Sequence, residues 1–106
     1  MSVKKIVSFD KRADKEFKKF PKGAQVEAQA SIKILARDGK LLEPFGKKID
    51  NNLFEVRIKF RGQWRLLYAY IIGNEVVILS AFQKKSQKTP VKEIQKAKER
   101  LRVYKT

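Results

Sequence analysis

One short segment gathers side chains that are suited to binding an anion. Residues 82–90 read Phe-Gln-Lys-Lys-Ser-Gln-Lys-Thr-Pro and join an apolar stretch to a short amphipathic one. Cationic, amide and hydroxyl groups therefore crowd into a turn between a predicted strand and a predicted helix. The free backbone amides at a helix N-terminus also attract anions. We therefore take Lys84, Lys85, Gln87 and Lys88 as candidate anion-binding residues.

The charge of the whole chain indicates what this anion is. The 106 residues include 26 Lys and Arg against 11 Asp and Glu, which gives a formal net charge of +15. Self-repulsion at this charge opposes compactness, so the excess favours a polyanionic partner such as nucleic acid or a nucleoprotein. An acidic protein, a membrane surface, and no special partner at all are the alternatives.

Two missing residue types narrow the chemistry. The chain has no histidine, which is the usual general base and the commonest metal ligand, and no cysteine. We therefore expect no zinc site, no cofactor, no disulfide and no histidine-based nuclease. The N-terminus lacks the apolar core of a signal peptide, and no apolar run approaches the ~20 residues needed to span a bilayer. The sequence predicts a cytoplasmic protein without a membrane partner.

Three strands are predicted to carry further cations. From Phe54 to Arg61, apolar and charged residues alternate with the period of a half-buried strand. A turn at 61–63 leads into a second strand over 64–72, and Gly73-Asn74 is a typical hairpin turn before a third strand over 75–83.

The turns also predict a register for these strands. We expect the pairs Phe60–Trp64, Ile58–Leu66, Val56–Tyr68, Ile72–Glu75, Tyr70–Val77, Arg65–Phe82 and Gln63–Lys84. One face of the sheet is then apolar, with the side chains of Phe54, Val56, Ile58, Phe60, Trp64, Leu66, Tyr68 and Tyr70.

The opposite face would collect Arg57, Lys59 and Arg65, with Lys84 at the end of the third strand. Like charges this close repel by on the order of 1 kcal/mol per pair, which a fold tolerates more readily when an anion fills the patch. For Lys59 an ordinary exposed strand position is the alternative, and Arg57 could pair with a nearby acid such as Glu55. Arg65 stands between two large apolar residues in the middle of a strand, so an ordinary exposed position explains this cation less well than a functional role does.

The remaining elements complete an α+β domain over residues 1–106 with a largely antiparallel sheet. A strand over 5–9 is followed by a helix that is N-capped by Asp10 and ended by Pro21. A second helix over 23–37 stops at Gly39, so that the two form a helical hairpin. Residues 41–49 are predicted as a loop, with at most a short extended piece. The last helix is predicted to have Thr89 as its N-cap and Pro90 at its first helical position.

Three motifs in this order resemble the RelE/HigB-type toxins of bacterial and phage toxin–antitoxin systems. They are Leu-Phe-Glu-Val-Arg at 53–57, Trp-Arg-Leu-Leu-Tyr at 64–68, and the 82–90 segment with Glu93, Ile94 and Ala97. The resemblance covers nearly the whole chain, and the last motif is the most specific. It implies a RelE-like fold: an N-terminal strand, a helical hairpin, a three-stranded antiparallel meander and a C-terminal helix.

The resemblance also implies a function. Such toxins are metal-independent endoribonucleases that cut mRNA on the ribosome by attack of a ribose 2′-oxygen on the adjacent phosphate. Arg57, Arg65 and Lys84 match the catalytic positions, with Lys85 as an alternative to Lys84 for the last cation. Further contacts to nucleic acid are expected from the basic and amide residues Lys59, Arg61, Lys85, Gln87 and Lys88.

The resemblance implies partners as well. We expect a cognate antitoxin, a small DNA-binding protein of helix-turn-helix type, with which a toxin that is monomeric alone forms a hetero-oligomer. Two departures concern the site: no tyrosine near Pro90 matches the base-stacking tyrosine of some relatives, and Glu55 stands where relatives carry a lysine. The residue that acts as general acid or base is therefore left open.

Two other functions fit the same residues. ParE-type toxins share the fold and inhibit DNA gyrase by binding, without cutting RNA. A non-catalytic RNA- or DNA-binding module would need only the charge. The convergent cations favour the nuclease, because a gyrase binder does not need them.

Overall fold

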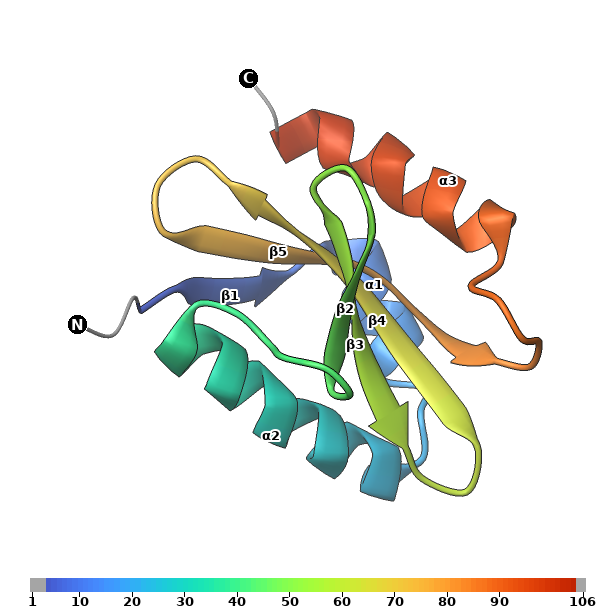
Figure 1. Cartoon of the computed structure of the whole chain (residues 1–106). Helices are drawn as coiled ribbons and strands as arrows, with labels where there is room; N and C mark the ends of the chain where they lie inside the picture. Colours follow the sequence, from blue (N-terminus) through green and yellow to red (C-terminus); the bar gives the residue numbers. More distant parts are fainter. Residues whose placement is uncertain (1–3, 105–106) are drawn as a thin grey trace.

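The computed structural model describes residues 4–104, which form a five-stranded sheet with helices on both faces (Figure 1). The elements in chain order are β1 (Ile6–Phe9), α1 (Lys11–Phe17), α2 (Lys22–Asp38), β2 (Gly46–Asp50), β3 (Leu53–Lys59), β4 (Gln63–Ile71), β5 (Glu75–Lys84), α3 (Val91–Leu101) and a 3₁₀ turn at Arg102–Tyr104. This order confirms the predicted α+β arrangement. None of the helices in the described part of the chain is long and apolar enough to cross a membrane.

The sheet has the strand order β1-β5-β4-β3-β2. Strands β3 to β5 are antiparallel neighbours, as predicted for the meander. Strand β2 adds to β3 in antiparallel, whereas β1 pairs with β5 in parallel. Strand β2 lies where the sequence predicted a loop with at most a short extended piece. The sequence pattern did not reveal it because β2 is a short edge strand in which only Gly46 is buried, so its residues do not alternate between apolar and polar.

The sheet separates two apolar cores. Helices α1 and α2 cover one face, where all eight predicted side chains of strands β3 and β4 are buried or packed against the core. Helix α2 contributes a buried stripe of Ala24, Ala28, Ile32 and Leu35. Helix α3 covers part of the other face, with Ala97 and Leu101 packed near Leu67 and Leu79. The uncovered part of this second face is where the predicted cations lie.

Helices α1 and α2 differ in small ways from the prediction. The side chain of Asp10 accepts a hydrogen bond from the backbone N–H of Arg12, which confirms the predicted N-cap. Helix α1 ends at Phe17, before the expected stop at Pro21, and Pro21 is instead the N-cap residue of α2. Gly39 ends α2 in the left-handed conformation, with φ of 80°, as its C-terminal position predicted.

The predicted register of β3 and β4 was wrong by two residues. Ile58, not Phe60, lies opposite Trp64, and Val56 lies opposite Leu66. The loop between these strands is formed by residues 60–62, because Arg61 and Gly62 both adopt positive φ and turn the chain earlier than expected. A shift of two residues leaves every side chain on its predicted face. The two-face pattern was therefore right although the pairing was not.

The register of β4 and β5 was correct at one end only. Arg65 lies opposite Phe82 and Gln63 opposite Lys84, as predicted. At the other end, however, Tyr70 pairs with Val76, and Ile71 rather than Ile72 pairs with Glu75. A bulge between these two regions adds one residue to β5, which compensates for the longer turn.

Beyond the end of β1, side chains take over the hydrogen bonds at the edge of β5. A side-chain N–H of Arg100 donates to the carbonyl of Leu79 at 2.9 Å, and the N–H of Ala81 donates to the carboxylate of Glu16 at 3.1 Å. Arg100 and Glu16 also pair with each other at 2.9 Å. These hydrogen bonds and this ion pair connect α1 and α3 to β5, and they hold in place the strand that leads to Lys84.

Candidate active site

Two arginines lie side by side in the uncovered part of the sheet. Arg57 on β3 is directly opposite Arg65 on β4, and Lys84 leaves the end of β5 opposite Gln63. The side chain of Arg65 is only 6% exposed, whereas that of Arg57 is 29% exposed. All three cations line one open hollow, together with Gln63 and residues 85–87. Of the four cations predicted to share this patch, Arg57, Arg65 and Lys84 are thus brought together.

Glu55 lies beneath these cations and was not predicted as a site residue. It is 1% exposed, and its carboxylate accepts hydrogen bonds from Nε of Arg57 at 3.0 Å and from the hydroxyl of Thr89 at 2.9 Å. Nε of Arg65 lies 3.7 Å from the same carboxylate. Glu55 thus neutralises part of the arginine charge and holds Arg57 in place. Its position on the same strand face as Arg57 was the sequence signal that could have identified it.

The guanidinium of Arg65 is held in place by hydrogen bonds to two neighbouring residues of β4. One terminal nitrogen donates to the carbonyl of Trp64 at 2.9 Å, and the other donates to the side-chain oxygen of Gln63 at 3.1 Å. Nε is buried without a hydrogen bond to any residue between 4 and 104. Burial lowers the pKa of this guanidinium from its ordinary value, and the neighbouring Arg57 acts in the same direction. A guanidinium nevertheless stays protonated, and its five N–H groups exceed those already used, so N–H groups remain for an anion.

The surroundings of Lys84 shift its pKa. Burial lowers its pKa below the ordinary lysine value, and the positive charges of Arg65, Arg57 and Lys47 lower it further against the opposing effect of Glu55. A lysine among cations loses its proton more readily. It can then act as an acid nearer to neutral pH, or as a base once it is neutral.

The loop after β5 places its side chains in two adjacent hollows. Lys85, Ser86 and Gln87 line the hollow of the arginines. Lys88 lies in a neighbouring one, which Gln87 also lines, together with Lys47 of β2. Lys47 is therefore a cation of this region that the sequence interpretation did not include.

The predicted cap of the last helix was wrong. Helix α3 starts at Val91 with Pro90 as its N-cap residue, and no side chain caps it. The hydroxyl of Thr89, which was expected in that role, donates to Glu55 instead. Thr89 therefore connects the loop to the buried carboxylate of the site.

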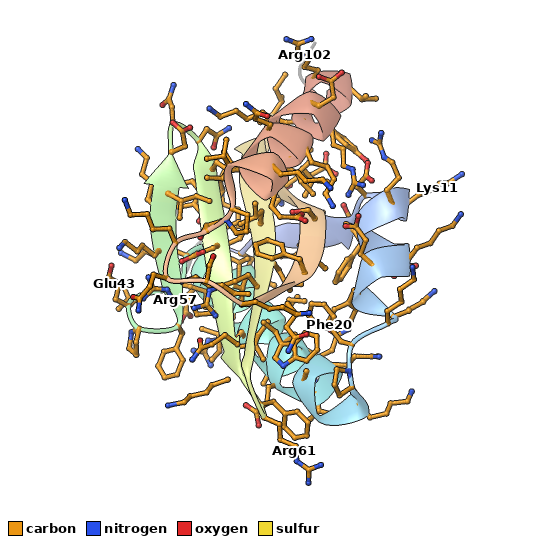
Figure 2. The ribbon with its side chains drawn as sticks, turned by 90° about the vertical axis from the view of Figure 1, so that its right-hand side faces the viewer. Lys11, Phe20, Glu43, Arg57, Arg61 and Arg102 are labelled. Carbon is orange, nitrogen blue, oxygen red and sulfur yellow. The ribbon has the colours of Figure 1, made fainter. Side chains whose placement is uncertain are left out.

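Besides Lys88, two predicted nucleic-acid contacts lie outside the central hollow. Lys59 is exposed and lines an adjoining groove beside β3, which shares Arg57, Gln63 and Arg65 with the hollow. Arg61 lies at the tip of the β3–β4 hairpin, away from Arg57 (Figure 2), with its guanidinium 5.5 Å from the ring centre of Phe60. Within residues 4–104, no cluster of three or more Asp, Glu, His or Cys side chains could hold a metal ion. The charged side chains that form the site are cations and one carboxylate, Glu55.

The fold is similar to that of solved toxin and toxin–antitoxin structures. The free form of an arginine double mutant of E. coli toxin RelE superposes with a TM-score of 0.70 at 17% identity, over 95% of this chain and 99% of that chain. At this identity the likeness shows the fold. A second match is the toxin–antitoxin complex RelBE2 from Mycobacterium tuberculosis, with a TM-score of 0.55 and 25% identity over 77% of this chain and 100% of that one. The architecture is therefore that of RelE-type toxins.

The family follows from the sequence itself. Residues 15–102 match the family described as Phage derived protein Gp49-like (DUF891), and this range covers most of the chain. The protein is therefore a member of the Gp49-like family, with a RelE-type fold. A comparison with curated protein sequences gives no significant match.

Proposed function

We propose that this protein is the toxin of a type II toxin–antitoxin system and that it cleaves mRNA on the ribosome. The observation that carries the proposal is the convergence of Arg57, Arg65 and Lys84 on one hollow. Three cations from three strands match the charge that a phosphodiester develops during cleavage. Family membership and the RelE-type fold support the toxin assignment, and a translation target implies action in the cytoplasm.

The proposed reaction needs no metal. The 2′-hydroxyl of a ribose loses its proton to water as its oxygen attacks the adjacent phosphorus, the bond from phosphorus to the 5′-oxygen breaks, and a 2′,3′-cyclic phosphate and a 5′-hydroxyl result. Arg65, held by Gln63 and the Trp64 carbonyl, is preorganised to bind the phosphate oxygens. Arg57 adds a second guanidinium from the neighbouring strand. Lys84, whose pKa is lowered, is suited to give a proton to the departing 5′-oxygen.

The proposal includes partners. The similar RelBE2 structure is a toxin–antitoxin complex, which supports a cognate antitoxin for this chain as well. We infer that the antitoxin is a small helix-turn-helix protein and that the toxin is monomeric without it. The net charge of +15 suits a ribosome, whose surface is RNA.

Mapping of mRNA 5′ ends in cells tests the proposal. Expression of the wild type should create new 5′ ends in phase with codons, and Arg65→Gln should abolish them while the protein remains folded. Arg37→Gln removes the same charge from an exposed position on α2 and should leave the pattern unchanged. A DNA-damage response without new mRNA ends would overturn the proposal in favour of a gyrase inhibitor. If Arg65→Gln does not fold, Lys84→Met provides the same test.

A further inference from the structure

The outer edge of β3 is only partly covered by β2. The N–H of Arg57 donates to the carbonyl of Phe45 at 2.8 Å, and the chain preceding Phe45 then turns away at Pro44. In an antiparallel ladder, outward-pointing backbone groups come from alternate residues. The carbonyl of Arg57 and both backbone groups of Lys59 therefore point outward, and none of them bonds to a backbone group outside the strand ladders within residues 4–104. A free strand edge remains there.

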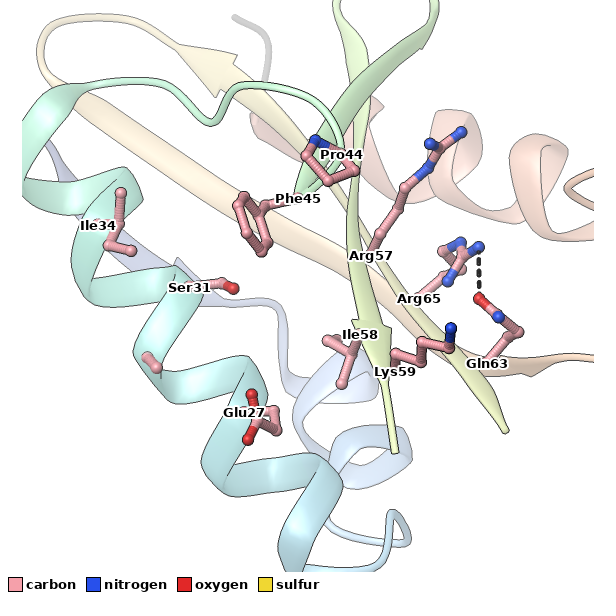
Figure 3. Close-up of a pocket in the computed structure, with 11 residues that line it drawn as sticks. Glu27, Ser31, Ile34, Pro44, Phe45, Arg57, Ile58, Lys59, Gln63 and Arg65 are labelled. Atoms are coloured by element: carbon pink, nitrogen blue, oxygen red, sulfur yellow. Dashed lines mark hydrogen bonds between the residues drawn. The ribbon is translucent and has the colours of Figure 1, made fainter. Parts of the chain in front are cut away.

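A groove of about 490 Å³ runs along this edge between α2 and β3. Figure 3 shows that its two sides differ. Toward α2 lie Ile34, Phe45 and Ile58, of which Ile34 is 41% and Phe45 60% exposed. On the other side of β3 lie Arg57 and the further basic or amide side chains of Lys59, Gln63 and Arg65. An apolar surface and a cationic surface therefore meet at one unpaired strand edge.

We propose that the β3 edge binds an extended peptide segment of a partner protein in which apolar and acidic side chains alternate. A peptide that adds as a strand points successive side chains to opposite faces of the sheet. One set would contact Ile34 and Phe45, and the other set would meet Arg57 and Lys59. Neither an all-apolar nor an all-acidic segment satisfies both sides.

The edge favours a peptide over a nucleic acid. Outward N–H and C=O groups at strand spacing match a peptide backbone, which offers the complementary groups at the same spacing. Glu27 also lines the groove on the α2 side, where it would repel a phosphate. An added strand keeps its acidic side chains on the opposite side of β3, away from Glu27.

Such binding would regulate the site next to it. An acidic side chain beside Arg57 and Arg65 would occupy the position that we assign to the RNA phosphate. The peptide and the RNA should therefore compete, as expected for an inhibitory segment of an antitoxin. This consequence rests on the proposed function, whereas the docking itself does not.

Synthetic peptides test the docking directly. The probe is a capped, labelled nine-residue peptide that alternates glutamate and valine, and the control has the same composition with all valines in one block. We expect the alternating peptide to bind at least tenfold more tightly in fluorescence anisotropy at physiological salt. Ile34→Lys should weaken it at least tenfold, and Val26→Lys, on the outer surface of the same helix, should not. Exchange of the Lys59 backbone amide, followed by NMR, should slow at least tenfold.

Three results would overturn the inference: equal binding of both peptides, unchanged exchange at Lys59, or protection of Lys59 by a short RNA and not by the peptide. Variants are compared only after thermal melting shows that they are folded. A peptide that is methylated on alternate backbone nitrogens cannot donate hydrogen bonds from them to β3, which gives a test with the unaltered protein. Because these measurements need no cleavage, a protein that binds the peptide but cuts no mRNA would refute only the proposed function. A protein that cuts mRNA but ignores the peptide would refute only the docking.

Discussion

Replacing Glu55 with glutamine should expose the repulsion between the arginines of the site. Glu55 is 1% exposed and pairs with Arg57 at 3.0 Å, and its carboxylate lies 3.7 Å from Arg65. Glutamine keeps the volume and can still accept a hydrogen bond, so the change removes chiefly the charge. The two facing guanidiniums are then left without their shared counter-ion.

The magnitude follows from opposing contributions. A pair of unit charges about 4 Å apart is worth about 4 kcal/mol at the effective dielectric constant of a protein surface. Solvent screens part of this, because the Arg57 side chain is 29% exposed, and the variant no longer buries a carboxylate. We therefore expect the free energy of unfolding to fall by about 2 kcal/mol, or by roughly 10 °C in melting temperature for a domain of this size.

Urea denaturation followed by tryptophan fluorescence measures the effect, because Trp64 is the single tryptophan and packs 4.8 Å from the ring centre of Phe20. Glu75→Gln is the matched control on an exposed strand position and should change stability by less than about 0.5 kcal/mol. Phosphate should restore more stability to Glu55→Gln than to the wild type at equal ionic strength. Equal stability of Glu55→Gln and the wild type would show that the carboxylate does not hold the arginines together.

Three further predictions concern other parts of the molecule. Arg100→Met should cost about 3 kcal/mol of unfolding free energy in urea, because it leaves a carbonyl and a carboxylate without their partner, whereas the exposed Arg102→Met should cost less than about 0.5 kcal/mol. Lys84→Met should abolish cleavage yet raise the melting temperature at pH 7. A lysine whose pKa is lowered in the folded state destabilises the fold while it is charged. The stability gained by the methionine variant over the wild type should therefore shrink as pH rises through the lysine pKa. Hydrogen bonds from Arg12 and Tyr104 lower the pKa of the Asp10 carboxyl in the folded state, so the stabilising effect of this group is lost as pH falls. Asp10→Asn should therefore lose less stability than the wild type below about pH 4, which a pH series of thermal melts measures.

Alternation of residue types predicted the site better than turn chemistry did. The side of the sheet on which Arg57 and Arg65 lie depends only on a period of two, which survived a register error of two residues. The loop between these strands depends on Arg61 adopting positive φ, which is unusual for a residue with a side chain and leaves no mark in the sequence. The faces were thus predictable, whereas the exact partners were not.

The missed residues share a physical reason. Glu55 was interpreted as a charged residue of an alternating strand and a possible partner of Arg57, and its burial depends on the loop that brings Thr89 over it. Lys47 joins the site only because β2 pairs with β3, and an exposed edge strand has no clear pattern. Both require tertiary contacts between segments far apart in the sequence. The Gp49-like family match and the RelE-type fold agree with the sequence resemblance, while the roles of the individual residues remain proposals.

The central claim is that the arginine hollow directs a ribose 2′-oxygen at the neighbouring phosphate. Purified protein should be given ribosomes programmed with a short mRNA, either all-ribose or with a single 2′-deoxynucleotide immediately before the bond that is cut. We predict cleavage of the all-ribose message, with a 2′,3′-cyclic phosphate and a 5′-hydroxyl at the new ends, and no cleavage at that bond in the substituted message. Cleavage of the deoxy-substituted bond, or of neither message, would contradict the account.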